Sequence, residues 1–352
     1  LEPIEQFEQK NYSNWKYKFF HIFNDMDTKQ VLSQIGNTPL VRLKQASELT
    51  QCNIYGKAEY FNPGESVKDR AALFIVQDAI KKKLIEKGGT IVEGTAGNTG
   101  IGLAIVCKEY GLKLKIVIPK TQSIEKKLLL KDLGAELIEV EAVPYANPNN
   151  YIKISKKIAE DLNKNDKNGV YWANQFDNTI NTESHLKTTA EEIWSQTNGE
   201  ISGFTCAVGT GGTLAGVSMG LKNKNKNIKI ALSDPMGSSL FSYITNKKLE
   251  STGNSITEGI GTGRITKNFE KAIIDYAFQT DDTEALKIVF DLIENQKIIL
   301  GGSSGINIAG AIKLAKKLGP GNTIVTILCD HGKRYASKIF NKEFLNTKKL
   351  PV

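Results

Sequence analysis

Apolar residues follow two alternating patterns along the chain. Short continuous runs, rich in β-branched residues, are separated by longer stretches in which apolar residues recur every three or four positions. The short runs are typical of strands buried on both faces, and the longer stretches are typical of amphipathic helices. The predicted strands are TIVEG (90–94), LKIVIP (114–119), AELIEV (135–140), FTCAVG (204–209), IKIALS (228–233) and TIVTILC (323–329).

Helices are predicted between these strands, at 71–85, 101–111 and 123–134, and most of them end near a glycine. Strands that alternate with helices indicate a mainly parallel sheet covered on both faces, which is an α/β fold. The number of strands favours two such sheets. A chain of 352 residues is long enough for one large or two medium domains. A polar, Asn-rich segment at 146–169 precedes the second group of strands.

Composition and charge exclude several classes of protein. The chain is 40% hydrophobic and 24% charged, as in ordinary globular proteins, and no apolar run is long enough for a membrane helix. The net charge of +8 comes from lysines that are spread along the chain, as at 163–169 and 222–230. Nucleic-acid binding is not expected, because it requires a clustered basic face with aromatic residues. An anionic substrate or cofactor is compatible with this charge.

The cysteines are far apart and form no C-x-x-C pair, so they are predicted to be buried free thiols in a reducing compartment. They are Cys52, Cys107, Cys206 and Cys329. The predicted location is the cytoplasm, with the mitochondrion as the alternative. With only three histidines and no paired cysteines, no metal site is expected.

Residues 1–25 are aromatic and polar, unlike the regular pattern that follows, and lack the apolar core of a signal peptide. They are predicted to be an N-terminal extension. A cloning remnant, a docking arm and a mitochondrial targeting segment are the alternatives.

Four glycine-bearing loops stand where a predicted strand gives way to a helix or near such a point, at 93–104, 207–216, 258–265 and 300–307. Ligands of open α/β sheets bind where strands end and helices begin. The loop GTGGT (209–213) can turn successive backbone N–H groups inward, and the following helix adds its positive end, so it is suited to a phosphate. Leu214 stands at the third glycine position of a dinucleotide fingerprint, which weighs against NAD.

Lys68 follows a Pro-Gly turn and starts an apolar helix, within EYFNPGESVKDRAAL (59–73). A cation is disfavoured at a helix N-terminus, so an ordinary surface lysine is a poorer interpretation here than elsewhere. A lysine amine can instead form a Schiff base with a carbonyl compound. A reactive lysine together with a phosphate loop points to pyridoxal 5′-phosphate.

The segment KAEYFNPGESVKDR (57–70) resembles the pyridoxal-phosphate attachment signature of the cysteine synthase and cystathionine β-synthase family, which are fold-type II enzymes. Further segments resemble other motifs of that family and occur in its order. They are IGNTPLVRL (35–43), GTAGNTG (94–100), QFDN (175–178), HLKTTAEEIW (185–194), GTGGT (209–213), GGSSG (301–305) and CDHGKRY (329–335).

The resemblance implies a role for each matching residue. Lys68 would bind pyridoxal phosphate covalently and then act as base and acid at the substrate Cα. Asn98 would bond the 3′-oxygen of the cofactor, and Ser303 would meet its pyridine nitrogen. The phosphate would be held by Gly209, Thr210, Gly211, Gly212 and Thr213. The substrate would be held by Thr95, Ala96, Gly97, Thr99, Gln175 and Gly259.

The resemblance also implies two doubly wound open-sheet domains with the cofactor in the cleft between them. The larger would combine 26–71 with 179–345. A small mobile domain, 72–178, would carry the substrate-carboxylate loop. Relatives of this kind are commonly homodimers, so a homodimer is expected. A serine acetyltransferase is a candidate partner.

The implied reaction is β-replacement or β-elimination on an amino acid through an aminoacrylate. The leading interpretation is a cysteine synthase, which converts O-acetylserine and sulfide to cysteine and acetate. Cysteine desulfhydrase and a haem-free cystathionine β-synthase-like enzyme are alternatives. From other classes, a catalytically silent relative that acts as a binding partner and a nucleotide-binding module remain open.

Three features depart from the family pattern. Ala96 stands where many cysteine synthases have serine, and Glu65 replaces a small residue. The loops 258–265 and 301–305 look nearer to the cystathionine β-synthase branch. The haem-binding region of some relatives has no counterpart, because Cys52 and His21 are poorly spaced for it. The C-terminal regulatory domain of that branch is not expected. Asp330 and His331 are candidates for a supporting role behind the site.

Overall fold

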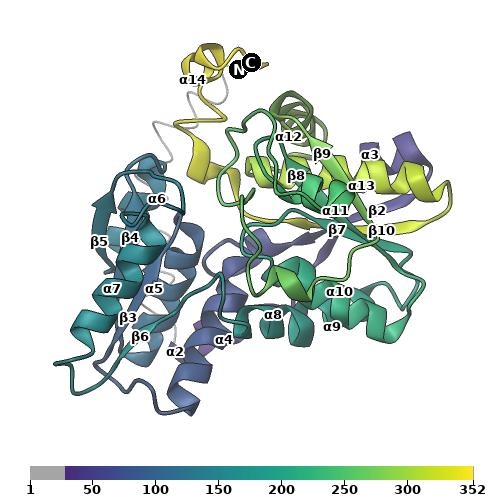
Figure 1. Cartoon of the computed structure of the whole chain (residues 1–352). Helices are drawn as coiled ribbons and strands as arrows, with labels where there is room; N and C mark the ends of the chain where they lie inside the picture. The colour runs from purple at the N-terminus through teal and green to yellow at the C-terminus, as the bar shows by residue number, and fades with distance from the viewer. Residues whose placement is uncertain (1–27, 352) are drawn as a thin grey trace.

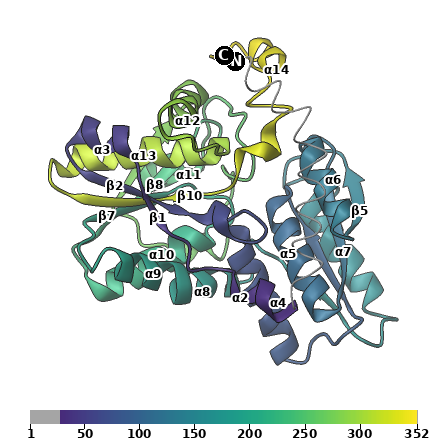
Figure 2. The same ribbon diagram turned by 180° about the vertical axis from the view of Figure 1, so that it is seen from behind.

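The structure, a computed structural model, describes residues 28–351. The predicted N-terminal extension therefore lies outside the described residues. Two β-sheets stand side by side, each with its own helices, and the C-terminal segment that leads to α14 lies at the top of both views, between them (Figures 1 and 2). This arrangement confirms the predicted α/β class with two open sheets.

Within the described residues the larger sheet has six strands in the order β1-β2-β10-β7-β8-β9. β1 is antiparallel to β2, and all other neighbours are parallel. The carboxyl ends of the parallel strands therefore meet at one edge, where α/β proteins bind ligands. The strands are β1 Leu40–Arg42, β2 Asn53–Ala58, β7 Gly203–Cys206, β8 Lys229–Pro235, β9 Tyr276–Thr280 and β10 Thr323–Leu328.

Both faces of the larger sheet are covered. On one face α10 packs on β7 through buried residues such as Leu214 and Phe204, and on the other α13 packs on β7, β8 and β10 through Leu314 and Ile324. The helices are α3 Lys44–Thr50, α8 Ile180–Ser184, α9 Ala190–Gln196, α10 Gly212–Lys224, α11 Leu240–Asn246, α12 Asp282–Gln296, α13 Gly302–Leu318 and α14 Lys342–Thr347.

The smaller sheet is parallel throughout, in the order β5-β4-β3-β6. Its core is continuous with the apolar faces of α4 and α5. Ile75 and Val76 of α4, Leu103 of α5 and Ile116 of β4 are fully buried in it. The elements are β3 Thr90–Gly94, β4 Lys113–Pro119, β5 Glu136–Val140, β6 Val170–Trp172, α2 Thr28–Ser33, α4 Lys68–Lys81, α5 Asn98–Tyr110, α6 Ile124–Asp132 and α7 Tyr151–Leu162.

All six predicted strands are present, with ends shifted by up to three residues. The three predicted helices are also present as α4, α5 and α6, although α4 starts at Lys68 rather than at 71 and ends at Lys81 rather than at 85. Four strands were not predicted: β1, β2, β6 and β9. The division of the chain into a large and a small mobile domain remains a prediction. In residues 28–351 no helix has the length and apolarity needed to cross a membrane.

A buried ionic cluster fixes the start of α4. Arg70 is 1% exposed and donates to both carboxylate oxygens of Glu59, at 2.8 Å each, and to both of Glu192, at 2.6 and 2.8 Å. Lys57 pairs with Glu192 at 2.6 Å. The cluster joins α4 to α9 and to η1 (Glu59–Phe61), which follows β2. It therefore holds the start of α4, where Lys68 lies, in place.

A second ionic cluster connects the two sheets. Lys126, on α6 of the smaller sheet, is 1% exposed and pairs at 2.6 Å with Glu258, which belongs to a loop beside the larger sheet. Lys338 binds the same carboxylate from the C-terminal segment. Burial lowers the pKa of Lys126, and the charge of Glu258 opposes this shift. The cluster closes one end of the gap between the sheets.

Candidate active site

The phosphate-type loop lies at the carboxyl end of β7 and leads into α10. Gly211 caps the helix with a φ of +89°, a conformation that favours glycine. Thr210 is held by a hydrogen bond from Asn181 to its hydroxyl, at 2.9 Å, and by one from Thr266 to its carbonyl, at 2.7 Å. The loop therefore lies at the positive end of a 13-residue helix, where backbone N–H groups can bind an anion.

Two glycines of this loop are required by close contacts. A Cβ atom at Gly209 would overlap the carbonyl oxygen of Gly259, and one at Gly212 would overlap the side-chain oxygen of Asn181. The loop thus packs directly against the backbone of the 258–265 loop, which brings together two of the four glycine-bearing loops predicted from the sequence.

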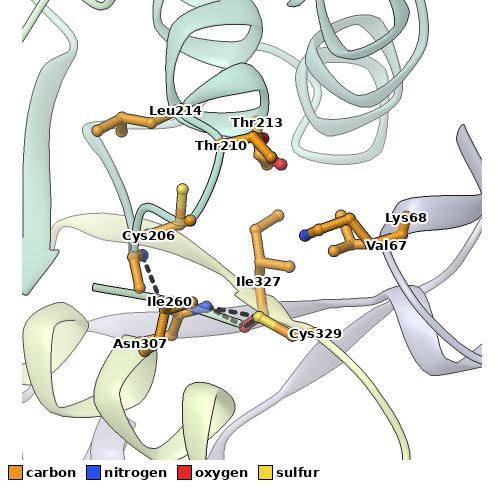
Figure 3. A pocket seen from close by; sticks show the side chains of 13 residues that line it. Val67, Lys68, Cys206, Thr210, Thr213, Leu214, Ile260, Asn307, Ile327 and Cys329 are labelled. Carbon is orange, nitrogen blue, oxygen red and sulfur yellow. Dashed lines mark hydrogen bonds between the residues drawn. The ribbon is translucent and has the colours of Figure 1, made fainter. Parts of the chain in front are cut away.

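Lys68 faces this loop across a pocket that Val67, Ile260 and Asn307 also line. Lys68 is the first residue of α4, and its amine points into the pocket (Figure 3). The lining includes Gly209, Thr210, Gly211 and Thr213. The structure therefore places the predicted lysine and most of the predicted phosphate loop around one cavity.

The rest of the pocket wall is apolar or carries thiols. Val67, Leu214, Ile260 and Ile327 supply apolar surface, and Cys206 and Cys329 supply thiols (Figure 3). Burial raises the pKa of Cys329 to about 11 and that of Cys206 well above its ordinary value, so both remain neutral at pH 7. This wall suits a flat, uncharged ring.

Asn307 and Ser303 on α13 support the wall. Asn307 lines the pocket, accepts from the N–H of Ala207 at 2.6 Å and donates to the Cys329 sulfur at 3.1 Å. Ser303 hydrogen-bonds Cys329, which lines the pocket, through its side chain. All four cysteines are free, and Cys52, Cys107 and Cys206 are buried as predicted, whereas Cys329 is partly exposed.

The predicted substrate loop follows β3 and leads into α5. Gly97 caps this helix with a φ of +125°, and its N–H donates to the Thr95 hydroxyl at 3.1 Å. Thr99 donates to the side-chain oxygen of Gln175 at 2.5 Å. Ala96, between Thr95 and Gly97, brings no side-chain donor to this turn.

Asn181 joins the two loops. Its amide donates to the carbonyl of Gln175 and to the hydroxyl of Thr210, both at 2.9 Å. The residues predicted to hold a carboxylate and those predicted to hold a phosphate are therefore linked through one buried side chain. Sequence reasoning missed Asn181, because nothing in its local pattern distinguishes it from a surface asparagine.

Asn98 is engaged by the closing segment of the chain. Its amide donates to Asp330 at 2.6 Å and accepts from Arg334 at 2.8 Å, and it does not line the pocket. Tyr335 donates to the same Asp330 oxygen at 2.6 Å. The hydrogen bond expected from Asn98 to the 3′-oxygen of the cofactor remains a prediction. Asp330 has the supporting position expected of it, and Arg334 is a partner that the sequence did not reveal.

Glu65 stabilises the turn before Lys68. Its φ of +52° explains why a small residue suits this position, and its carboxylate pairs with Lys333 at 2.5 Å. The Arg334 guanidinium lies 3.8 Å from the Glu65 carboxylate and donates to the Gly64 carbonyl. The unusual glutamate is therefore part of the contact between this turn and the closing segment.

His185 supports the phosphate-type loop from behind. It is 1% exposed, and its two ring nitrogens lie 3.1 Å from the Thr213 hydroxyl and 2.9 Å from that of Thr189. Burial lowers the pKa of His185 to about 3, so the imidazole is neutral. It orients the Thr213 hydroxyl without adding charge.

These features together describe a site for a compact ligand with an anionic end, a flat ring and a carbonyl group that can react with an amine. Backbone N–H groups would bind the anion, the apolar wall would bind the ring and Lys68 would meet the carbonyl. The neighbouring loop at 95–99 offers a second anion position at the N-terminus of α5.

The family described as pyridoxal-phosphate dependent enzyme matches residues 31–330 of this chain. Cysteine synthase 1 of Neurospora crassa is 48% identical over a match that covers 92% of this chain and 86% of that protein. Cysteine synthase 1 of Emericella nidulans is 50% identical and covers 90% and 85%.

Solved structures agree with this result. An O-acetylserine dependent cystathionine beta-synthase from Helicobacter pylori has a TM-score of 0.79 and 32% identity, over 88% of this chain and 97% of that one. A hydrogen sulfide-producing enzyme from Fusobacterium nucleatum has a TM-score of 0.77 and 34% identity, over 87% and 98%.

Proposed function

This chain belongs to the pyridoxal-phosphate dependent enzymes, and we propose that it is a cysteine synthase, which replaces the acetate of O-acetylserine with sulfide. The observation that carries the proposal is the pocket in which the Lys68 amine faces the GTGGT loop. The neighbouring turn at 95–99, with its Thr99–Gln175 hydrogen bond, supplies a place for the carboxylate of an amino acid.

The residues present fit pyridoxal phosphate. Gly209 and Gly212 let the loop pack against the Gly259 carbonyl and the Asn181 side chain, and the donors that this turn offers an anion are backbone N–H groups rather than charged side chains. Lys68 is placed to hold the aldehyde carbon. When bound, the cofactor supplies an electron-withdrawing ring that acidifies the Cα–H of an attached amino acid and lets a β-substituent leave.

The protein's own groups then have separate tasks. The Lys68 amine takes the proton from the substrate Cα and returns it. Thr95, Gly97, Thr99 and Gln175 hold the substrate carboxylate and so fix which bond at Cα faces the lysine. Ser303, whose neutral hydroxyl hydrogen-bonds the pocket residue Cys329, would meet the pyridine nitrogen without forcing it to stay protonated.

We also propose that the smaller sheet and its helices move as a domain, 72–178, over the larger body formed by 26–71 and 179–345. Closure would bring the 95–99 loop onto the substrate and exclude water from it. The Lys126–Glu258 pair, which joins α6 to the loop beside the larger sheet at 2.6 Å, is a contact that opening of the small domain would have to break.

The cofactor assignment predicts that Gly209→Ala weakens pyridoxal-phosphate binding. The new methyl group would overlap the Gly259 carbonyl, and overpacking of this kind costs about 1–3 kcal/mol, which corresponds to a loss of affinity of about 5- to 150-fold if all of it falls on the bound state. Affinity would be measured by titrating the apoenzyme and following its visible absorbance. Gly263→Ala is the matched control, since its nearest neighbour lies 3.9 Å away. Equal affinities in the two variants would contradict the assignment.

Sulfide release from cysteine is a second candidate activity. The chain's similarity to the hydrogen sulfide-producing enzyme favours it, and the same binding residues would serve both reactions. A cystathionine-forming activity is favoured in the same way by the similarity to the Helicobacter pylori enzyme. All three reactions share the first half, in which the β-substituent leaves.

Steady-state assays of the holoenzyme separate these candidates. We expect O-acetylserine and sulfide to give cysteine with a higher kcat/KM than that of sulfide release from cysteine alone. Homocysteine in place of sulfide tests the cystathionine-forming reaction. Faster sulfide release than cysteine formation would overturn the proposed synthase activity while leaving the cofactor assignment intact.

The compartment and the assembly follow from weaker observations. We propose the cytoplasm, because all four cysteines are free thiols; the mitochondrion remains the alternative. A homodimer and a serine acetyltransferase partner stay predictions that rest on the family resemblance. Light scattering of the purified protein, alone and with the acetyltransferase, would test both.

A further inference from the structure

A buried carboxyl group with no cation lies beside the proposed substrate site. Glu93, near the end of β3, is 1% exposed and stands two residues before Thr95. Its hydrogen-bond partners are the side chain and backbone of Gln175 and the backbone of Asn174. Gln175 is the residue whose side-chain oxygen accepts from Thr99. Glu93 is thus one contact away from the position proposed for the substrate carboxylate.

The hydrogen bonds around Glu93 are incomplete if it is ionised. One carboxylate oxygen, Oε2, is buried without a partner, and so is the side-chain oxygen of Asn174. Two buried acceptors without donors are costly, whereas a proton on Glu93 would turn one of them into a donor. Burial also raises the pKa of this carboxyl to about 8, against hydrogen bonds that favour the charged form.

We propose that Glu93 is kept as a neutral carboxylic acid that positions Gln175 for the substrate carboxylate, and that its ionisation blocks substrate binding. The proposal rests on the proposed function, because it requires an amino-acid carboxylate at the 95–99 loop. The physical reason is charge repulsion. Two negative charges in a buried site repel each other strongly, and the substrate carboxylate stays ionised when Glu93 loses its proton.

Other titratable groups near Glu93 do not change charge over the same range. Tyr151 faces it from α7 and Tyr171 from β6. Burial raises the pKa of Tyr151 to about 12 and also raises that of Tyr171, so both remain neutral when Glu93 ionises. Arg264, whose charge acts on Tyr151, is paired with Asp177 at 3.2 Å. Glu93 is therefore the group that sets the local charge as pH rises.

The test compares the wild-type holoenzyme with Glu93→Gln, whose amide mimics the neutral acid. Calorimetric binding of L-alanine, which has the carboxylate but no leaving group, would be followed from below to above pH 8. Relative to the variant, wild-type affinity is expected to fall about tenfold per pH unit once Glu93 ionises. Proton loss from the substrate amine affects both proteins equally and cancels in the ratio.

Infrared difference spectra give a second readout that needs neither substrate nor turnover. At pH 7 the wild type is expected to show a protonated-carboxyl band that Glu93→Gln lacks. Asp234→Asn is the matched control: Asp234 is also buried with one unpartnered oxygen, but lies at the end of β8 in the larger sheet. Its replacement should leave the pH dependence of alanine binding unchanged.

Identical pH profiles in wild type and Glu93→Gln would overturn the proposal, as would a wild-type spectrum without the band. If Glu93→Gln fails to fold, Glu93→Asp takes its place in both measurements, because the wild-type band alone could come from Asp69, another buried carboxyl whose pKa burial raises to about 7. Alanine binding with the expected pH dependence but without cysteine formation would overturn the proposed synthase activity alone. No amino-acid binding at any pH would overturn both.

Discussion

Lys68→Ala is expected to lower kcat for cysteine formation by about a thousandfold or more, because one amine both holds the cofactor and moves the proton at Cα. The purified variant should also lose the visible absorbance of the bound cofactor. The fold should survive: the side chain ends in a pocket, and a cation at the N-terminus of α4 opposes the helix dipole. Thermal unfolding and steady-state kinetics would be measured together.

Lys81→Ala is the matched control, since Lys81 is the exposed last residue of the same helix. It should retain wild-type kcat and absorbance. A Lys68→Ala protein that stays coloured and active would remove the basis of the proposed function. Loss of activity accompanied by a large drop in melting temperature would instead assign a structural role to Lys68.

Arg70→Ala is expected to reduce the free energy of unfolding by about 3–5 kcal/mol, the cost of leaving a buried carboxylate without its partner. Glu59 is 0% exposed and depends on both hydrogen bonds from Arg70. Arg70→Lys should lose part of this stability, because an ammonium cannot reproduce the bidentate contact. Urea unfolding of the variants would give the values.

The matched control is Lys82→Ala, which removes an exposed ion pair with Asp78, at 2.7 Å, from the same helix. Such pairs contribute about 0–1 kcal/mol, so little change is expected. A loss in Arg70→Ala no larger than in this control would show that the buried cluster does not stabilise α4.

The pH dependence of stability has a definite sign for this cluster. Burial alone would raise the pKa of Glu59, but the charge and hydrogen bonds of Arg70 outweigh it and lower the pKa from 4.5 to about 2. The cluster therefore stabilises the fold above pH 4.5 and loses that contribution as pH falls towards 2. Arg70→Ala should show a shallower loss over this range in urea titrations.

The sequence predicted the strands that are long and apolar, because their pattern alone distinguishes them. β1 and β6 are only three residues long, too short for any period to be visible. β2 contains a polar Asn53, Gly56 and Lys57, and is a strand because β10 pairs with all six of its residues. β9, YAFQT, is an edge strand whose partner lies about 45 residues earlier.

For the site, local motifs predicted the loops but not the contacts between them. Lys68 and GTGGT could be identified because glycine spacing and an ill-placed lysine are local signals. Asn181 and Arg334 could not, since each acts by joining segments far apart in the chain: Arg334 meets Asn98 across 236 positions.

Lys126 shows the same limit in another way. Its segment, SIEKKLLLKDLG (123–134), reads as an amphipathic helix with a solvated lysine face, and the helix is present. Yet this lysine is 1% exposed, because Glu258 and the Tyr335 ring, 4.4 Å from its nitrogen, enclose it. A charge can be buried when its partner comes from a different sheet, and no pattern within one helix reveals that.

The phosphate-type loop would bind the phosphate of the cofactor through its main chain. The site therefore has one part in which substitutions are costly and another in which they can change specificity. The glycines of 209–213 are fixed by close contacts, and the hydroxyls of its threonines are held by Asn181 and His185, so substitutions there are expected to weaken cofactor binding. The apolar wall at Ile260 is where a designer could alter which nucleophile is accepted. Directed libraries for new sulfur, selenium or nitrogen nucleophiles should therefore start at Ile260 and spare 209–213 and Gln175.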